Sequence, residues 1–413
     1  MNIAILNGSP KGERSFTIQH VKYLQKTFSD CNFQFYNVAQ EIRQMERNAN
    51  AFTETINKIA NSDAVLWASP VFYFLVPSQY KRFIELIFER GAQEAFRGKY
   101  TAAITTSIHI LDHMAHNYIN SVCDDLQMNF IDFYSGEPND LYKEKERIRL
   151  QTFGEFFFRS ISGNLPTIKY NKPLQWTFPD YKRNPIKPIN TDKKVLIVVD
   201  NLDGNSSLHG MVEDLQYAFN PQAELVQLKD INIKGGCLGC LHCAADNHCV
   251  YEGKDDFNSF FNNRIRNADI LFFAGTIKDR FLSATWKCFL DRSFFMGHVP
   301  VLEDKQIGYI IDGPLDQLFN LREWLTAYAA IQHANMIGIV SNDTVNQEEI
   351  NLALASLINS AVLASQLNYT KPPTFLKLGT NKLFRDVMLS GLREMFQADD
   401  RYYKSHGYYE NNY

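Results

Sequence analysis

Four cysteines close together in the second half of the chain are the residues best suited to chemistry. They are Cys237, Cys240, Cys243 and Cys249, arranged as two consecutive Cys-x-x-Cys steps and a longer gap. Thiolates at this spacing can turn toward one point and bind an iron-sulfur cluster or zinc. The run favours a 4Fe-4S cluster, because zinc sites usually separate two cysteine pairs by a longer segment. Three alternatives stay open: zinc, a metal-free loop that acts as a lid, and disulfides.

A short loop near the start of the sequence is a second candidate site, because it could bind a phosphate. An apolar strand is expected over residues 3–6, and a helical pattern follows the loop. Ser9, Ser15 and Thr17 offer hydroxyls, and backbone N–H groups at a helix start attract anions. Lys11 adds positive charge. The loop is neither a Walker loop nor a Gly-x-Gly-x-x-Gly motif, and the alternative is an ordinary turn with a serine cap.

Strands and helices alternate along the first half of the chain, which indicates a parallel sheet covered on both faces. Further elements are expected as strands over residues 32–38, 64–70, 100–106 and 128–134, and as a helix over 52–60. Loops follow two of these strands at 71–78 and 107–116. Ligands of such sheets bind beyond the carboxyl ends of the strands. These loops and the loop after residue 6 should therefore line one site.

The same architecture starts again near residue 194. Strands are expected over residues 194–199, 223–228 and 268–274, and the cysteine run follows the second of them. The intervening segment is rich in proline and aromatic residues, as a connector across a surface would be. The predicted organisation is a first domain over 1–165, a connector over 166–192, a second domain over 193–370, and an aromatic C-terminal tail over 371–413.

The composition suits ordinary globular domains and excludes several functions. The chain has 413 residues, 45% of them hydrophobic, and a net charge of -4. This length allows two domains with full cores, and the charge gives no basic field for nucleic acid. The apolar segment 352–367 carries too many polar residues for a membrane span, and the first residues do not resemble a signal peptide. We expect a cytoplasmic protein that binds neither nucleic acid nor membranes.

Two loops of the first half resemble those of a known family. They are similar to loops of the flavodoxin-like NADPH-dependent FMN reductase family, including its iron-sulfur flavoprotein branch. The first loop contains Asn7-Gly-Ser-Pro-Lys and Ser15-Phe-Thr, and the second contains Ser69-Pro-Val-Phe-Tyr, followed by Lys81. The resemblance implies two tandem flavodoxin-like α/β domains, each a doubly wound five-stranded parallel sheet with helices on both faces. It places the FMN phosphate on Ser9, Lys11, Ser15, Phe16 and Thr17, the isoalloxazine edge against Pro70, Val71, Phe72, Tyr73 and Phe74, and the far side of the ring near Thr106 and Ser107. Phe16 stands where the family usually has asparagine.

The second half resembles the same family but departs from it at the phosphate loop. Lys287-Cys-Phe-Leu-Asp-Arg is similar to a family motif, and the cysteine loop is similar to the family's lid. Asp200 and Asp203, however, would repel a phosphate, which makes FMN doubtful in this domain. In the iron-sulfur branch, the cluster of one subunit approaches the flavin of another. The resemblance therefore implies that this chain fuses such a pair into an intrachain pseudo-dimer, and a homodimer of the chain stays open.

Three histidines near the end of the fourth strand suggest a further site. His109, His113 and His116, with Asp112, have the spacing of one helical face. Such a group could bind a metal or relay a proton. The alternative is a polar helix start at the rim of the flavin pocket.

Together these features predict an FMN-dependent NAD(P)H oxidoreductase of the flavin, quinone or small-molecule reductase type. FMN lies in the first domain, a 4Fe-4S cluster is a further candidate cofactor on the cysteine loop, and NAD(P)H donates electrons. The acceptor is a small-molecule substrate or a redox partner protein, and no residue is assigned as catalytic. The alternatives are a non-catalytic electron-transfer flavoprotein and a zinc-binding scaffold with degenerate flavin sites. The fold alone does not choose the substrate.

Overall fold

The computed structural model describes residues 1–344 and 346–410. The chain divides into two compact units. The first unit comprises Met1–Pro173 together with Gly236–Cys240, and the second comprises Leu174–Gly235 and Leu241–Tyr413. A short piece of the cysteine run therefore belongs to the first unit, although it lies far along the sequence.

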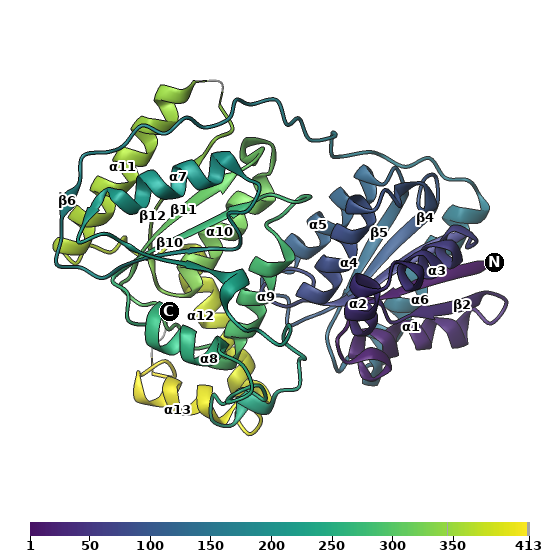
Figure 1. Ribbon diagram of the computed structural model, residues 1–413. Helices are drawn as coiled ribbons and strands as arrows, with labels where there is room; N and C mark the ends of the chain where they lie inside the picture. The colour runs from purple at the N-terminus through teal and green to yellow at the C-terminus, as the bar shows by residue number, and fades with distance from the viewer. Residues whose placement is uncertain (345, 411–413) are drawn as a thin grey trace. The chain divides into compact units, whose positions relative to one another are not determined.

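The first unit is built on a five-stranded parallel sheet with the strand order β2-β1-β3-β4-β5 (Figure 1). The strands are β1 (Asn2–Asn7), β2 (Asn32–Tyr36), β3 (Ala64–Pro70), β4 (Tyr100–Thr106) and β5 (Asn129–Gly136). β1, β3 and β4 are buried along almost their whole length, which explains their continuous apolar sequences. The strand order reverses between β1 and β3, where doubly wound sheets bind their ligands.

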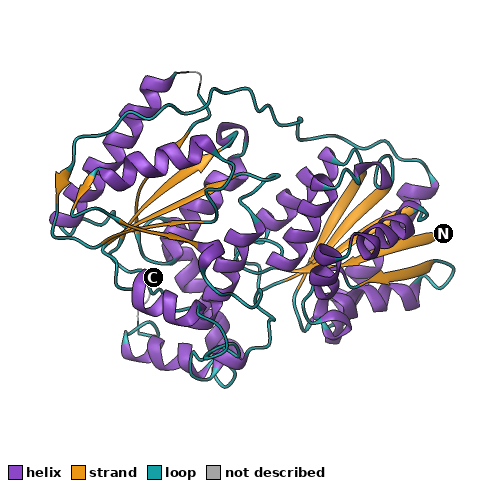
Figure 2. Ribbon diagram, in the orientation of Figure 1, coloured by secondary structure: helices purple, strands orange, loops and turns teal. Residues whose placement is uncertain are grey.

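Helices cover both faces of this sheet (Figure 2). They are α1 (Phe16–Thr27), α2 (Val38–Arg47), α3 (Ala49–Ala60), α4 (Ser78–Glu89), α5 (His113–Asp125) and α6 (Glu144–Ser162). Successive strand residues point to opposite faces. Ile3 and Ile5 join a core with α1 and α6, whereas Trp67 packs against Tyr80 of α4 with ring centroids 5.8 Å apart. The predicted doubly wound architecture is thus confirmed for this unit.

The second unit contains another five-stranded parallel sheet, with the order β12-β11-β10-β7-β9. Its strands are β7 (Val195–Val199), β9 (Glu224–Gln227), β10 (Ile270–Thr276), β11 (Gln306–Asp312) and β12 (Asn335–Ser341). A separate pair consists of β6 (Ile189–Asn190) and β8 (Phe219–Asn220). Counted along the chain, the main sheet repeats the order of the first unit, as the structural repeat predicts.

The helices of the second unit also lie on both sides of its sheet (Figure 2). They are α7 (Ser206–Tyr217), α8 (Phe257–Phe260), α9 (Ala284–Arg292), α10 (Phe319–Ile331), α11 (Gln347–Gln366), α12 (Phe375–Val387) and α13 (Gln397–Ser405). α7 and α11 share one core with the strands. Near the C-terminus, Phe396 and Tyr403 pack with Ala244 of the cysteine run. The aromatic tail is therefore part of the core of this unit.

Several elements were not predicted, among them α2 and the strands β11 and β12 of the second unit. Strands β3 and β4 have the predicted ranges. α2 is mostly polar, and its buried residues Val38, Ile42 and Met45 recur at helical spacing among charged side chains. The analysis instead extended the preceding strand to Val38. Among the described residues, none of the helices has both the length and the apolar character that crossing a membrane requires.

Candidate functional site

Three loops at the carboxyl ends of β1, β3 and β4 contain the residues predicted to hold FMN. Residues 8–15 follow β1, residues 71–77 follow β3, and Ser107 follows β4. Two contacts tie these loops together. The Val71 N–H donates to the Thr106 carbonyl at 3.1 Å, and the hydroxyl oxygens of Thr17 and Thr106 are 2.6 Å apart. Side chains from distant parts of the first unit thus meet at one edge of its sheet.

Buried polar contacts hold the loop after β1 in shape. The fully buried Asn7 accepts the Ser9 N–H at 3.0 Å and donates to the side chain of Asn37 at 2.8 Å. The Ser9 hydroxyl in turn accepts the Lys11 N–H at 3.2 Å. Gly12 has φ 58, a conformation that favours glycine, and a Cβ there would lie 2.2 Å from the Gln40 side chain. The loop is therefore ordered, and Asn7 and Asn37 are site-shaping residues that the sequence analysis did not identify.

The N-terminus of α1 is the part of this loop best suited to an anion. Ser15 occupies the N-cap, yet within the described chain its side chain makes no capping hydrogen bond. Backbone N–H groups in the first turn of a helix need a partner, and the positive end of the helix favours negative charge. The hydroxyls of Ser9, Ser15 and Thr17 are all buried here. This set of donors fits the phosphate of FMN.

The loop after β3 is a strained turn with aromatic side chains. Tyr73 and Phe74 have φ values of 43 and 62, in the left-handed region that side chains disfavour. Paired hydrogen bonds between Phe72 and Leu75, at 2.8 and 3.1 Å, hold the turn. Each such residue costs on the order of 1–3 kcal/mol, and strain of this kind is frequent at ligand sites. The turn provides a rigid apolar wall beside the end of β4, which suits the edge of a flat ring.

Ser107 begins a polar network around Asp112. The carboxylate of Asp112 accepts hydrogen bonds from Ser107 at 3.2 Å and Ser135 at 2.5 Å, and lies 3.0 Å from Nδ1 of His109. Burial opposes ionisation, but the bonds from His109 and Ser135 lower the pKa of Asp112 below its usual range. The same contact with Asp112 raises the pKa of His109. An ionised Asp112 therefore orients the loop that follows β4.

The expectation that three histidines share one helical face is wrong. α5 begins at His113, so His109 lies before the helix. His116 points elsewhere, with Nε2 2.7 Å from the Thr105 hydroxyl and its ring stacked on Phe133 at 4.0 Å. Across residues 1–344 and 346–410, no group of three or more histidine, cysteine or carboxylate side chains is placed to hold a metal ion.

His116 should make the stability of the first unit depend on pH. Burial lowers the pKa of His116 to about 4. An unfolded histidine titrates near about pH 6.5, so between these values the unfolded chain binds more protons and folding loses up to about 3 kcal/mol as the pH falls. NMR titration of His116 and hydrogen exchange of the first unit, read by mass spectrometry at about pH 4 and pH 7, test this expectation. His116→Gln should flatten the dependence, and the exposed His113→Gln should not. Titration of His116 at its ordinary value would contradict it.

The structure gives no support to a cluster on the cysteine run. Cys237 and Cys240 belong to the first unit, whereas Cys243 and Cys249 belong to the second. Cys243 contacts the Phe294 carbonyl with an S–O distance of 3.8 Å. Because the described residues include no group of three or more metal-binding side chains, the predicted 4Fe-4S site finds no support in the geometry. No reaction step is derived through a cluster.

A buried ion pair holds the base of the cysteine loop in the second unit. Arg292 donates to both carboxylate oxygens of Asp255, at 2.7 and 3.0 Å, and to the Gly235 carbonyl at 3.0 Å. The Lys234 N–H donates to the same carboxylate at 3.0 Å. Burial raises the pKa of Asp255, but the guanidinium of Arg292 outweighs it and lowers the pKa overall. The two chain ends on either side of residues 236–254 are thereby held together.

The second unit fills the equivalent sheet edge with its own polar groups. Asn205 caps α7 by accepting the Leu208 N–H at 2.8 Å, and it donates to Asp312 at 2.6 Å. Asp200 accepts the Ser283 hydroxyl at 2.6 Å, and burial raises its pKa to about 6. The first turn of α7 is therefore already capped, and buried carboxylates stand beside it. This edge suits a phosphate less well than the uncapped start of α1.

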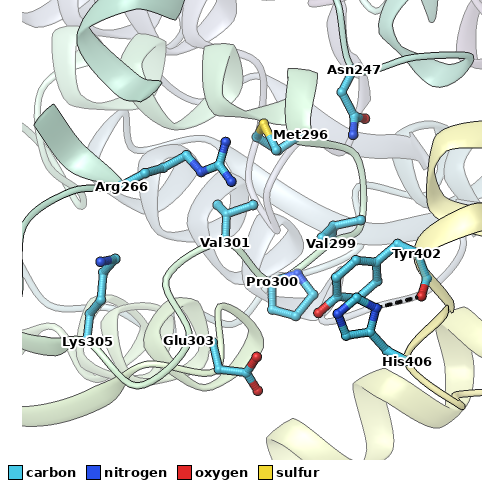
Figure 3. A pocket seen from close by; sticks show the side chains of 10 residues that line it. All are labelled: Asn247, Arg266, Met296, Val299, Pro300, Val301, Glu303, Lys305, Tyr402 and His406. Atoms are coloured by element: carbon cyan, nitrogen blue, oxygen red, sulfur yellow. Dashed lines mark hydrogen bonds between the residues drawn. The ribbon is translucent and has the colours of Figure 1, made fainter. Parts of the chain in front are cut away.

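A cavity of about 470 Å³ lies at the opposite edge of the second sheet (Figure 3). Its lining includes Arg266 and Lys305, which precede β10 and β11, so it lies at the amino ends of these strands. Tyr402 and His406 stack face to face at 3.9 Å on one side of it (Figure 3). Ligands of doubly wound sheets bind at the carboxyl ends. The cavity is therefore separate from the cofactor edge of its own sheet.

Comparisons with known proteins match a family model to the first part of the chain and find similar solved structures. Residues 1–132 match the family described as NADPH-dependent FMN reductase. Similar solved structures include the flavoenzyme NAD(P)H:(acceptor) oxidoreductase FerB from Paracoccus denitrificans, which is 21% identical, covers 39% of this chain and 97% of its own, and has a TM-score of 0.33. General stress protein 14 from Treponema denticola in complex with FMN is 12% identical, with coverage of 39% and 98% and a TM-score of 0.29. An apo NADH:FMN oxidoreductase is 17% identical, with coverage of 42% and 97% and a TM-score of 0.34. No curated protein sequence matches the chain.

Proposed function

Residues 1–132 form a domain of the NADPH-dependent FMN reductase family, and from this premise we propose that the protein is an FMN-dependent oxidoreductase that takes electrons from NAD(P)H in the cytoplasm. Its acceptor is a flavin, a quinone or another small molecule. When bound, FMN supplies the hydride and single-electron chemistry. The protein binds this cofactor, orients it and shields it.

The uncapped start of α1 is the observation that carries this proposal. The phosphate of FMN would lie against the backbone N–H groups of Phe16 and Thr17, with the hydroxyls of Ser9 and Ser15 around it. The ammonium of Lys11 adds the opposite charge. Each of these donors is present before the ligand arrives, so binding needs little reordering of the loop.

Other residues of the same edge would hold the ring. The turn that contains Tyr73 and Phe74 would lie against one edge of the isoalloxazine system, and its paired backbone hydrogen bonds hold the turn in shape. Thr106 and Ser107 line the opposite side, and Thr17 links them to the phosphate loop through its hydroxyl contact with Thr106. One connected set of contacts would therefore hold both the ring and the phosphate.

We expect one FMN per chain after reconstitution, and anaerobic bleaching of its absorption band by NADPH or NADH. Flavin content and the rate of bleaching are the measurements, and protein reconstituted with riboflavin, which lacks the phosphate, is the control. Two FMN per chain would show that the second unit also binds the cofactor. Bound FMN that neither nicotinamide reduces would favour an electron carrier over a reductase, and failure to bind FMN would contradict the proposal.

An iron-sulfur cluster on the four cysteines is the finer part of the sequence prediction, and it rests on their spacing and on the resemblance to the iron-sulfur flavoprotein branch. Iron and sulfide assays on protein purified without oxygen test it directly. Because the described residues include no group of three or more side chains placed to hold a metal ion, we expect less than one iron per chain. Four irons per chain would restore the cluster and would reverse the inference drawn next.

A further inference from the structure

Two of the four cysteines lie within the first unit, against the loops assigned to FMN. The segment Gly236–Cys240 is part of that unit. The Gln79 side chain donates to the Cys237 carbonyl at 3.0 Å, at the start of α4. A Cβ placed on Gly239 would lie 2.9 Å from the Phe72 ring and 3.4 Å from Cε of Lys11. The backbone between the two cysteines therefore contacts one residue of the ring loop and one of the phosphate loop.

The chemistry of this pair differs from that of the remaining cysteines. Cys237 and Cys240 form a Cys-x-x-Cys motif, which closes readily into a disulfide and opens again on reduction. Both are thiols in this structure, and Cys240 is exposed. The Gly239 N–H donates to the sulfur of Cys237 at 3.4 Å, and the side chain of Lys11 lies beside Gly239. These are the conditions in which a cysteine pair is reactive.

We propose that Cys237 and Cys240 are a reversible dithiol–disulfide pair that exchanges electrons with the flavin site, and this inference rests on the function proposed above. In the oxidised pair, the S–S bond breaks, two electrons and two protons are taken up, and two S–H bonds form. The electrons come from NAD(P)H through FMN, which returns to its oxidised form. The dithiol then passes two electrons and two protons to an external disulfide, and its own S–S bond forms again. The substrate class implied for this site is therefore a disulfide, of a small thiol or of a protein.

The pair can be tested first without flavin. The full-length apoprotein is equilibrated anaerobically in mixtures of reduced and oxidised dithiothreitol, thiols are alkylated, and each cysteine peptide is quantified by mass spectrometry. Cys237 and Cys240 should become protected from alkylation together as the mixture becomes more oxidising. The dependence of this protection on the redox potential should have the slope of a two-electron couple. Cys240→Ser should abolish protection of Cys237, whereas the matched control Cys31→Ser, elsewhere in the first unit, should leave it unchanged. Independent oxidation of the two thiols, or four cysteines bound to iron, would overturn the inference.

The link to the flavin is tested on the same protein after oxidation and loading with FMN. Adding NADPH or NADH without oxygen should release two alkylatable thiols, at Cys237 and Cys240, and the release should require FMN. Gln79→Ala, which removes the contact to the Cys237 carbonyl, should slow this release by about tenfold while FMN content stays the same. A flavin that is bleached while the disulfide stays intact would overturn this inference and leave the proposed function standing. Absence of bound FMN would overturn the proposed function as well.

Discussion

Replacing Ser15 with aspartate should remove most FMN binding and leave the apoprotein at least as stable as the parent. Ser15 occupies the N-cap of α1 without making a capping bond. Aspartate is a good N-cap residue and favours the positive end of a helix, so the free energy of unfolding should rise by about 0.5–1 kcal/mol. The same carboxylate would stand beside the FMN phosphate. Two like charges about 4 Å apart repel by about 4 kcal/mol near a protein surface, so we expect the Kd for FMN to rise at least about 100-fold.

The matched control is Ser15→Asn, which caps the helix without adding charge. Fluorescence titration with FMN and thermal unfolding of the apoprotein separate the two effects. The aspartate variant should lose affinity and the asparagine variant should lose much less, while both keep or increase their Tm. Equal losses in the two variants would mean that size or shape, and not charge, matters at this position. Unchanged affinity in the aspartate variant would place the phosphate elsewhere.

Replacing Arg292 with methionine should destabilise the second unit by about 3–5 kcal/mol. The substitution leaves the Asp255 carboxylate buried with the Lys234 N–H but without its guanidinium partner. It also removes the contact to the Gly235 carbonyl and the stacking on Tyr251, whose ring centroid is 4.3 Å from the guanidinium carbon. Adding Asp255→Asn should recover part of the loss, because the uncompensated charge is then absent.

Hydrogen exchange read by mass spectrometry measures each unit separately, which a single unfolding curve does not. In Arg292→Met, protection from exchange should fall across the second sheet and stay unchanged in the first. Arg292→Lys keeps the charge but not the paired geometry, so its protection should lie between that of the parent and that of Arg292→Met. Arg292 lowers the pKa of Asp255, so this stabilisation is present at neutral pH and is lost as acid protonates the carboxylate. The difference between the parent and Arg292→Met should therefore shrink at low pH. If the stability difference persists at low pH, the loss in Arg292→Met comes from packing and not from the ion pair.

Strands β3 and β4 were predictable because their burial determines the kind of residues in their sequences, whereas β11 and β12 were not predicted. β3 and β4 are buried on both faces, so they are short continuous apolar runs between turn signals. α2 was not predictable in the same way, since only one narrow side of it is buried and the rest is charged. A pattern of Val38, Ile42 and Met45 at steps of four and three was the signal that could have revealed it.

The site was predictable at the level of loops and not of contacts. Loops that follow parallel strands meet at one edge, so Ser9, Tyr73 and Thr106 could be grouped from strand positions alone. The contact between Thr17 and Thr106 joins residues far apart in the chain, and no local sequence pattern predicts it. The division of the cysteine run between two units likewise depends on tertiary packing. The spacing of the cysteines indicates which ligands the loop could bind, but it does not indicate which residues each half of the loop packs against.

The capped start of α7 bears on how the protein would turn over. Asn205 satisfies the helix end in the second unit, so the proposed function leaves a single flavin position in the chain. With one such position, the flavin would be reduced by the nicotinamide in one half-reaction and reoxidised in the next, by the Cys237–Cys240 pair or by another acceptor. The chain would therefore work as an alternating, ping-pong catalyst. A duplicated fold would then double the size of the protein without doubling the number of electrons it holds on flavin.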